Sequence, residues 1–577
     1  MKKVIALLLL AAMLTLSLAS CSVDLTDMGA IIPMYLATPQ SNLDPTRMIY
    51  DKDFVKTSGL VFQTLTEVDA DGDINYVMIE DWEQKYDDER GEYFLYIDLT
   101  YSRWNDGRTF TADHVVYSWK RILSPEVASP AAALLYDVKN AKAVKAGLMT
   151  IDDLGVAAVD IDTLEVQLEK AIDPELFFEA ISSPALVPLR DDAVNNKENT
   201  WATNTNDLST NGQFSVKEME TQGVYRLDFS KYYRLPVEVE DGYNEFVKPY
   251  RLISDYAKTA EEALAAFQNG EIYYVGSFTN EGYEANKKDI ESSDTTSSFT
   301  YFFDCENSVL KNAVVRKALS LALSREEVAA IIGQGSKAAE GFVSYNATGS
   351  SLNKSFRKEA GAVYSVAADV ATAQSLLSQA GVSGGSFSIT YRSDRAYDVK
   401  VAEYAKSVWE NLGFKVTLKG LALSAYEEAL YSSDFDVIGL DYFGLSTNAY
   451  AALAPFAPSY SGSIVSVDAD SSGIAPHVTG YSSDAYTALL DEILNETSRK
   501  GRNEKLIALE KLLAEDCPAI ALCFYTNNYL ASDELKDLNT NRYGYTVFTE
   551  ATLKDYKEKN AAWEAQQEAL TKNQAAK

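Results

Sequence analysis

Histidine and cysteine are scarce in this sequence of 577 residues. There are only two histidines, His114 and His477, and they lie far apart. Zinc sites need ligands at fixed short spacings, such as H-E-x-x-H, and the sequence has no such pattern. After the N-terminal segment the cysteines are Cys305, Cys517 and Cys523, an odd number and too few for a disulfide-stabilised scaffold. We therefore expect no metal or other cofactor, and at least one free thiol that is buried and inert.

The motifs of common enzymes and the basic clusters of nucleic-acid-binding proteins are also missing. The sequence has no G-x-S-x-G nucleophile elbow and no P-loop. A glycine-containing segment at 333–338 follows a predicted helix instead of a strand, so it lacks the context of a dinucleotide-binding turn. With 84 acidic residues, some carboxylates fall near one another by chance, and no acid–base pair can be assigned. A net charge of -32 disfavours binding to phosphates. We expect a protein that is not an enzyme and has no nucleic-acid partner.

Long apolar runs are confined to the N-terminus. Lys2 and Lys3 precede an apolar run that ends at Leu18. No later run approaches the roughly 20 residues that a membrane-spanning helix requires. A short positive segment followed by a short apolar run is the pattern of a secretory signal peptide.

The residues that follow this run predict a lipid anchor. The sequence LASC at 18–21 resembles the lipobox of bacterial lipoproteins, which implies cleavage before Cys21 and lipid on its sulfur and amine. The alternative is an ordinary signal peptide cut near Ala19. We expect a signal peptide at 1–20 and a lipidated tether at 21–29, which hold a soluble body to a membrane surface by two or more acyl chains.

Segments with strand periodicity alternate with segments of helical periodicity along the rest of the chain. The stretch YFLYIDLTY at 93–101 alternates as a half-buried strand does. From Ala112, after a capping residue at Thr111, apolar residues recur at helical spacing as far as Leu123. Trp119 belongs to this apolar set, so we expect it in a core. The alternation predicts sheets covered by helices, and its recurrence in both halves predicts two lobes.

Several of these segments, in this order, resemble the bacterial extracellular solute-binding proteins of family 5, the oligopeptide and dipeptide receptors of ABC importers. The stretch RWNDGRTFTADHVVYSWKRI at 103–122 is similar to the family signature, although His114 stands where an aspartate is usual. The segment VVRKALSLALSREEV at 314–328 is similar to a second family motif, with Ser324 in place of an aspartate. The resemblance extends over 32–548. Further similar segments are NGQF, NGEI, AQSLLSQAG, NLGFKVTL, FDVIGLDY and CFYTNNYLAS.

The resemblance implies a two-lobed α/β fold of the periplasmic-binding-protein type (type II, cluster C-like), whose first lobe carries an extra α/β subdomain. Two strand crossings would join the lobes, and a solute would be buried between them when they close like a hinge. The implied divisions are lobe one at 30–66, 209–280 and 521–548, the subdomain at 67–208, lobe two at 281–520 and a charged tail at 549–577.

The function implied is that of an extracytoplasmic peptide receptor. It would capture oligopeptides between its lobes and deliver them to the permease subunits of an ABC transporter, as a monomer anchored to the cell membrane through Cys21. Two alternatives fit the same fold: a signalling or structural lipoprotein that no longer transports, and a receptor for another solute such as a sugar. The acidic composition favours neutral or cationic solutes.

The resemblance also implies where a peptide would be held. In oligopeptide-binding members, an aspartate a few residues beyond a tryptophan, after F-D-V, pairs with the peptide's α-ammonium group. The matching segment FDVIGLDYFGLST has Tyr442 at the tryptophan and Leu445 at the aspartate, so that acid is missing. Asp441 could supply the charge, or it could instead bond to backbone or water. Aromatic side chains of this segment and of 301–303 would line the cleft, except Phe302, which we expect in the core. The ligand-binding residues predicted in this way are Asp441, Tyr442, Phe443, Leu445, Tyr301 and Phe303.

Overall fold

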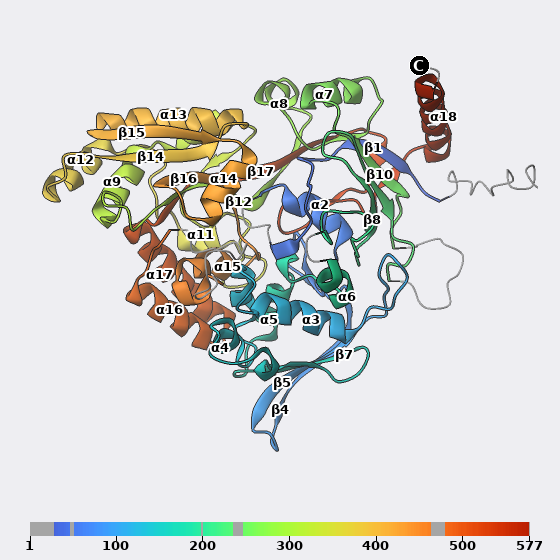
Figure 1. The fold of residues 1–577 in the computed structure, drawn as a ribbon, viewed down its shortest axis with the longest axis horizontal. Helices are drawn as coiled ribbons and strands as arrows, with labels where there is room; N and C mark the ends of the chain where they lie inside the picture. Colours follow the sequence, from blue (N-terminus) through green and yellow to red (C-terminus); the bar gives the residue numbers. More distant parts are fainter. Residues whose placement is uncertain (1–27, 47–50, 198–199, 235–245, 463–478, 576–577) are drawn as a thin grey trace, which may run out of the picture.

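The computed structural model has two α/β lobes beside one another and a smaller subdomain that contacts both (Figure 1). The predicted signal peptide, Cys21 and His477 lie outside the described residues. Within the described ranges no helix has both the length and the apolar character needed to cross a membrane. The structure describes residues 28–46, 51–197, 200–234, 246–462 and 479–575.

A single sheet of eleven strands runs through both lobes. Its two longest strands, β12 (Glu291–Phe303) and β17 (Ala519–Ala531), pair with each other in antiparallel fashion. β17 also pairs with β11 (Tyr274–Val275) of lobe one, whereas β12 also pairs with β16 (Val437–Phe443) of lobe two. These two strands therefore connect the lobes. Their register shifts between residues 294 and 298 of β12, and irregularities of this kind bend a strand pair.

Lobe one is built around β1 (Ile31–Tyr35), which lies between its parallel neighbours β10 (Arg251–Asp255) and β11. The antiparallel strands β9 (Val224–Phe229) and β8 (Phe214–Met219) extend the sheet. Apolar side chains of these strands share a core with residues of α2 (Phe54–Val61). This packing fixes the position of the charged segment that immediately precedes α2.

In lobe two, β16 pairs in parallel with β14 (Gly385–Arg392), and β14 pairs in parallel with β15 (Phe414–Leu421) at the edge of the sheet. Helices α9 (Ala313–Ala322) and α13 (Ala396–Asn411) contribute to a core around Trp409, which is fully buried. The carboxyl ends of β14 and β16 lie at the same edge of the sheet. Open α/β sheets bind their ligands at such edges.

The subdomain confirms one local prediction in detail. Helix α3 (Ala112–Leu123) has the bounds that the sequence pattern predicts, and Trp119 is buried with its ring 5.9 Å from that of Phe177. At the start of α3, His114 Nδ1 accepts a hydrogen bond from the Thr111 N–H at 3.0 Å. His114 therefore fills the role that an acidic residue has in a capping box.

The antiparallel strands of the subdomain, in sheet order, are β4 (Ile79–Asp87), β5 (Glu92–Leu99), β7 (Thr163–Leu168) and β6 (Val156–Ala158).

A buried carboxylate joins the subdomain to lobe two. Glu179 lies in α5 (Pro174–Ile181) of the subdomain and is fully buried. Its oxygens accept hydrogen bonds from Thr447 Oγ1 at 2.8 Å and Asn448 Nδ2 at 3.0 Å, and they form an ion pair with Arg499 at 2.8 Å. Since all three partners belong to lobe two, these contacts exist only when the subdomain is docked against that lobe.

The three described cysteines are free, and two of them are buried. Burial raises the pKa of Cys305 to about 11 and that of Cys517 to about 12. Burial also raises the pKa of Cys523. The prediction of a free, buried thiol is confirmed, and the raised pKa values disfavour the reactive thiolate.

The C-terminal helix α18 (Tyr556–Ala575) begins beside the first strand of lobe one. The buried side chain of Asn560 accepts a hydrogen bond from the Ile31 N–H and donates one to the Gly29 carbonyl, each at 2.8 Å. Trp563, one turn later, lies 6.0 Å from the Arg251 guanidinium. The first turns of α18 therefore fasten the two ends of the described chain to each other.

Candidate binding site

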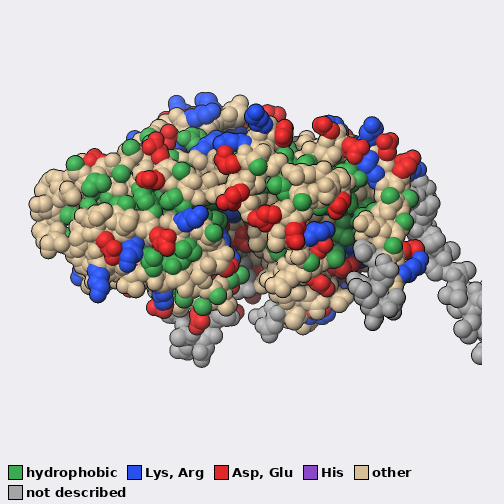
Figure 2. All heavy atoms as spheres, turned by 90° about the horizontal axis from the view of Figure 1, so that it is seen from above, with side chains coloured by type: hydrophobic (Ala, Val, Ile, Leu, Met, Phe, Trp, Pro, Cys, Tyr) green, Lys and Arg blue, Asp and Glu red, His purple; other side chains and the backbone are tan. Residues whose placement is uncertain are grey.

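A cavity of about 160 Å³ lies between lobe one and lobe two. The two lobes meet along a narrow seam in the view of Figure 2, where acidic and basic side chains are interspersed. Charged side chains from both lobes line the cavity, so a ligand held there contacts both. Its walls are formed by residues 38–42, Asp51 and Phe54 of lobe one, and by Arg392, Arg395, Asp441 and residues of α14 (Leu423–Tyr431) of lobe two.

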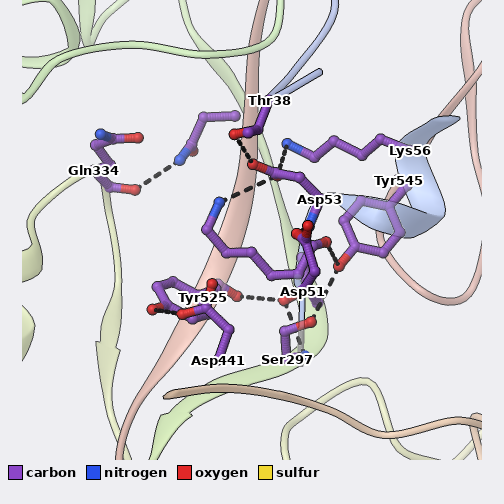
Figure 3. A network of polar contacts seen from close by, with 12 residues as sticks. Thr38, Asp51, Asp53, Lys56, Ser297, Gln334, Asp441, Tyr525 and Tyr545 are labelled. Atoms are coloured by element: carbon purple, nitrogen blue, oxygen red, sulfur yellow. Dashed lines mark hydrogen bonds and ion pairs between the residues drawn. The ribbon is translucent and has the colours of Figure 1, made fainter. Parts of the chain in front are cut away.

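On the side of lobe two, Asp441 is already paired with a cation. Its carboxylate contacts both terminal nitrogens of Arg395, at 2.7 and 3.2 Å. It also accepts a hydrogen bond from the Tyr525 hydroxyl at 2.5 Å (Figure 3). Arg395 also contacts Asp398 at 2.9 Å. Burial, opposed in part by Arg395, raises the pKa of Asp398 to about 6. Asp441 is 3% exposed, and its charge is compensated from within lobe two.

On the side of lobe one, Asp53 immediately precedes α2 and has two cationic partners. Lys52 and Lys56 each place their ammonium nitrogen 3.1 Å from a carboxylate oxygen of Asp53 (Figure 3). The Thr38 hydroxyl donates to the other oxygen at 2.8 Å. Burial by itself raises the pKa of Asp53, but the two lysines outweigh it and hold this pKa well below its usual range.

Asp51 lines the same cavity and has only neutral partners. Its carboxylate accepts hydrogen bonds from the Asp53 N–H at 2.8 Å and from Gln40 Nε2 at 3.1 Å. Among the residues that the structure describes, no lysine or arginine lies within ion-pair distance of it. Burial, followed by the charge of Asp53, raises the pKa of Asp51.

Of the six residues predicted to bind ligand, Asp441 lines this cavity, whereas the two on β12 lie elsewhere. Tyr301 and Phe303 face the helix-covered side of lobe two, with their rings 5.8 and 6.3 Å from that of Trp409. Alternation along the strand sends both side chains to this face. Phe302 faces the opposite core, as predicted.

The other three predicted residues lie in the core shared by lobe two and the subdomain. The Tyr442 hydroxyl donates to the Ala452 carbonyl at 2.9 Å. Phe443 is fully buried, with its ring 5.7 Å from that of Tyr543. Leu445 is 2% exposed. In this arrangement of the lobes, the β12 pair and these three residues are used for packing, and a contact between them and a ligand stays a prediction.

Apart from Asp441, the charged residues on both walls of the cavity were not predicted from the sequence. Arg392 ends β14 and Arg395 comes three residues later, in the sequence RSDR. Asp51 belongs to the run DKD just before α2. A cluster of charges at the carboxyl end of a strand was the available signal, because ligand sites form at such ends. The sequence alone does not indicate that residues 51–53 and 392–395 lie near one another in the fold.

Comparison with known proteins places this geometry in context. A sequence model of the bacterial extracellular solute-binding proteins, family 5 (middle region), matches residues 101–463. The oligopeptide-binding protein OppA of Bacillus subtilis is 25% identical over 85% of this chain and 87% of its own length. The periplasmic murein peptide-binding protein MppA of Escherichia coli is 27% identical over 76% of this chain and 78% of its own length. The solved structure of Listeria monocytogenes OppA bound to peptide superposes with a TM-score of 0.73 at 23% identity, and covers 91% of this chain and 99% of that one. The two-lobed α/β fold expected from the sequence is thereby confirmed.

Proposed function

The chain belongs to family 5 of the bacterial extracellular solute-binding proteins, and on that premise we propose that it captures short peptides between its lobes and delivers them to the permease of an ABC importer. Two relatives that match it over most of their length are named for binding oligopeptides and murein peptides. A solved structure of the same fold holds a peptide. These likenesses support a peptide as the class of ligand.

The observation that carries the proposal is the cavity walled by charged side chains of both lobes. Peptides differ in their side chains but share a backbone and charged termini, so a tolerant receptor uses polar contacts for these common parts. A ligand that contacts both walls stabilises the closed arrangement in proportion to its preference for that arrangement. The irregular pairing of β12 and β17 supplies a place where the connection between the lobes can bend.

The proposal includes the place and partners of the protein. Lipid on Cys21 would hold the receptor at the outer face of the cell membrane, where a single chain can meet both solute and permease as a monomer. Its role would be binding without chemistry on the ligand. Asp441 stays a proposed contact for the ligand, as a member of the ion pair that it forms with Arg395.

The test is ligand capture by the protein purified from cells. Native mass spectrometry should show a bound species with the mass of a short peptide. After that ligand is removed, adding a tripeptide library should raise the melting temperature in step with its concentration, whereas an equimolar mixture of mono- and disaccharides should not. Stabilisation by the sugars alone would contradict a peptide ligand.

A further inference from the structure

We propose that Asp51 of lobe one is the carboxylate that pairs with a primary ammonium group of the ligand. This inference rests on the proposed function and adds to it, because it names the charge that the ligand must carry and the lobe that receives it. The family resemblance places the expected acid in lobe two, where this chain has Leu445 instead.

On the lobe-two wall, the carboxylate of Asp441 already has a cationic partner. Asp441 has a bidentate contact with Arg395 and a third bond from Tyr525, which leaves little of its acceptor capacity open. A ligand ammonium at Asp441 would have to displace the guanidinium or share the carboxylate with it. Both carry a penalty, because breaking a buried ion pair leaves a charge without a partner.

On the lobe-one wall, the two acids that flank Lys52 differ in their partners. Asp53 receives both nearby lysines, at 3.1 Å each, and a hydroxyl as well. Asp51, two residues earlier, receives one backbone N–H and one amide N–H. The structure has therefore compensated the charge of Asp53 and left that of Asp51 uncompensated, although both lie in the same segment.

Asp51 has room for further hydrogen-bond donors. An ionised carboxylate can accept about four hydrogen bonds, and the described partners provide two to Asp51. A primary ammonium group brings three donors and the missing positive charge. The pKa of Asp51 is raised because burial and the nearby charge of Asp53 both disfavour a negative charge there. A ligand ammonium group would offset both effects. Asp51 is partly exposed and lines the cavity, so a ligand can reach it.

Two ligand groups share this chemistry, the α-ammonium of a peptide and the side-chain ammonium of lysine. Three tripeptide libraries separate them: a free-amine library without lysine or arginine, the same library N-acetylated, and an N-acetylated library with lysine at its middle position. Apparent dissociation constants come from the dependence of melting temperature on library concentration. The proteins are the full chain and its Asp51→Asn, Asp441→Asn and Asp44→Asn variants.

We expect the wild type to bind at least one of the two ammonium-bearing libraries more tightly than the lysine-free acetylated one. Asp51→Asn should weaken binding of the ammonium-bearing library about 10- to 100-fold and remove this preference, because a charge-assisted contact is lost. Asp44→Asn is the matched control, since Asp44 pairs with Arg121 at 3.0 Å and does not line the cavity. Asp51→Ser is the second variant should Asp51→Asn fold poorly, as judged by its melting temperature without ligand.

The outcomes separate this inference from the proposed function. Equal binding of all three libraries by the wild type would show a peptide receptor without an ammonium contact, and would overturn the role of Asp51 alone. A preference that survives Asp51→Asn and disappears in Asp441→Asn would assign the contact to Asp441. Failure of every library to stabilise the wild type would remove the peptide function, and the inference with it.

Discussion

Replacing Glu179 by alanine should undo the docking of the subdomain against lobe two. The carboxylate is fully buried and is bonded by Thr447, Asn448 and Arg499 of that lobe. Without it, the partners left to the guanidinium of Arg499 within the described ranges belong to Glu175: its carboxylate at 3.7 Å and its carbonyl oxygen at 3.3 Å. The Arg499 side chain is 5% exposed. Removing one partner of a buried ion pair costs about 3 to 5 kcal/mol. We expect Glu179→Ala to lose stability in this range.

The pH dependence of this effect has a definite sign. Burial by itself raises the pKa of Glu179, but Arg499 and the hydroxyl and amide donors outweigh it, so the pKa lies below its unfolded value of 4.5. A depressed pKa gives stability that is present above the unfolded value and is lost as the pH falls through the folded one. The difference between wild type and Glu179→Gln should therefore be full at pH 7 and shrink below about pH 4.5.

The loss of stability is measured by urea unfolding, with hydrogen exchange of the α5 amides as the probe of that helix. Glu175→Ala is the matched control, because this glutamate lies on the same helix with 57% of its side chain exposed, and exposed pairs contribute about 0 to 1 kcal/mol. The reasoning would be refuted if Glu179→Ala and Glu175→Ala unfolded at the same urea concentration, or if the effect of Glu179→Gln did not change with pH.

Two further predictions concern the N-terminus and the subdomain. Cys21→Ala should move the protein from the membrane fraction to the soluble fraction, or leave it as uncut precursor, and unchanged partitioning into detergent would contradict the lipid anchor. Burial, followed by the charge of Arg190, lowers the pKa of His114, so its neutral form is favoured in the fold and stability should fall as the pH drops below about 6.5. His114→Asp keeps an acceptor for the Thr111 N–H, and its melting temperature should change less than that of wild type between pH 7 and pH 5.5.

The sequence predicts helix bounds well where the helix is set by neighbouring residues, such as a capping residue and apolar spacing. Helix α3 begins at its capping threonine and ends where the apolar spacing stops, so its bounds could be read from the pattern alone. The identity of the fold came from motifs in a fixed order, which the family match over 101–463 bears out.

The binding site depended on contacts that the sequence does not display. Asp441 and Arg395 are 46 positions apart, so the cation that neutralises the predicted acid could not be seen from either segment. The alternation of side chains puts Tyr301 and Phe303 on the same face of β12. It does not indicate that this is the face covered by the helices of lobe two. The sequence DKD does not show that Lys52 pairs with Asp53 and that the partners of Asp51 are neutral. Only the three-dimensional contacts distinguish the two acids.

The two hydrogen bonds of Asn560 would have a mechanical consequence under the proposed attachment to the membrane through Cys21. A pull on the tether reaches the body at Gly29, where Asn560 of α18 grips the backbone on both sides of residue 30. The load then passes into β1, which is hydrogen-bonded to β10 and β11 along its two edges. Force applied along such a strand shears many bonds together instead of opening them one at a time. A pull from the proposed lipid anchor would therefore be borne first by β1 and the start of α18.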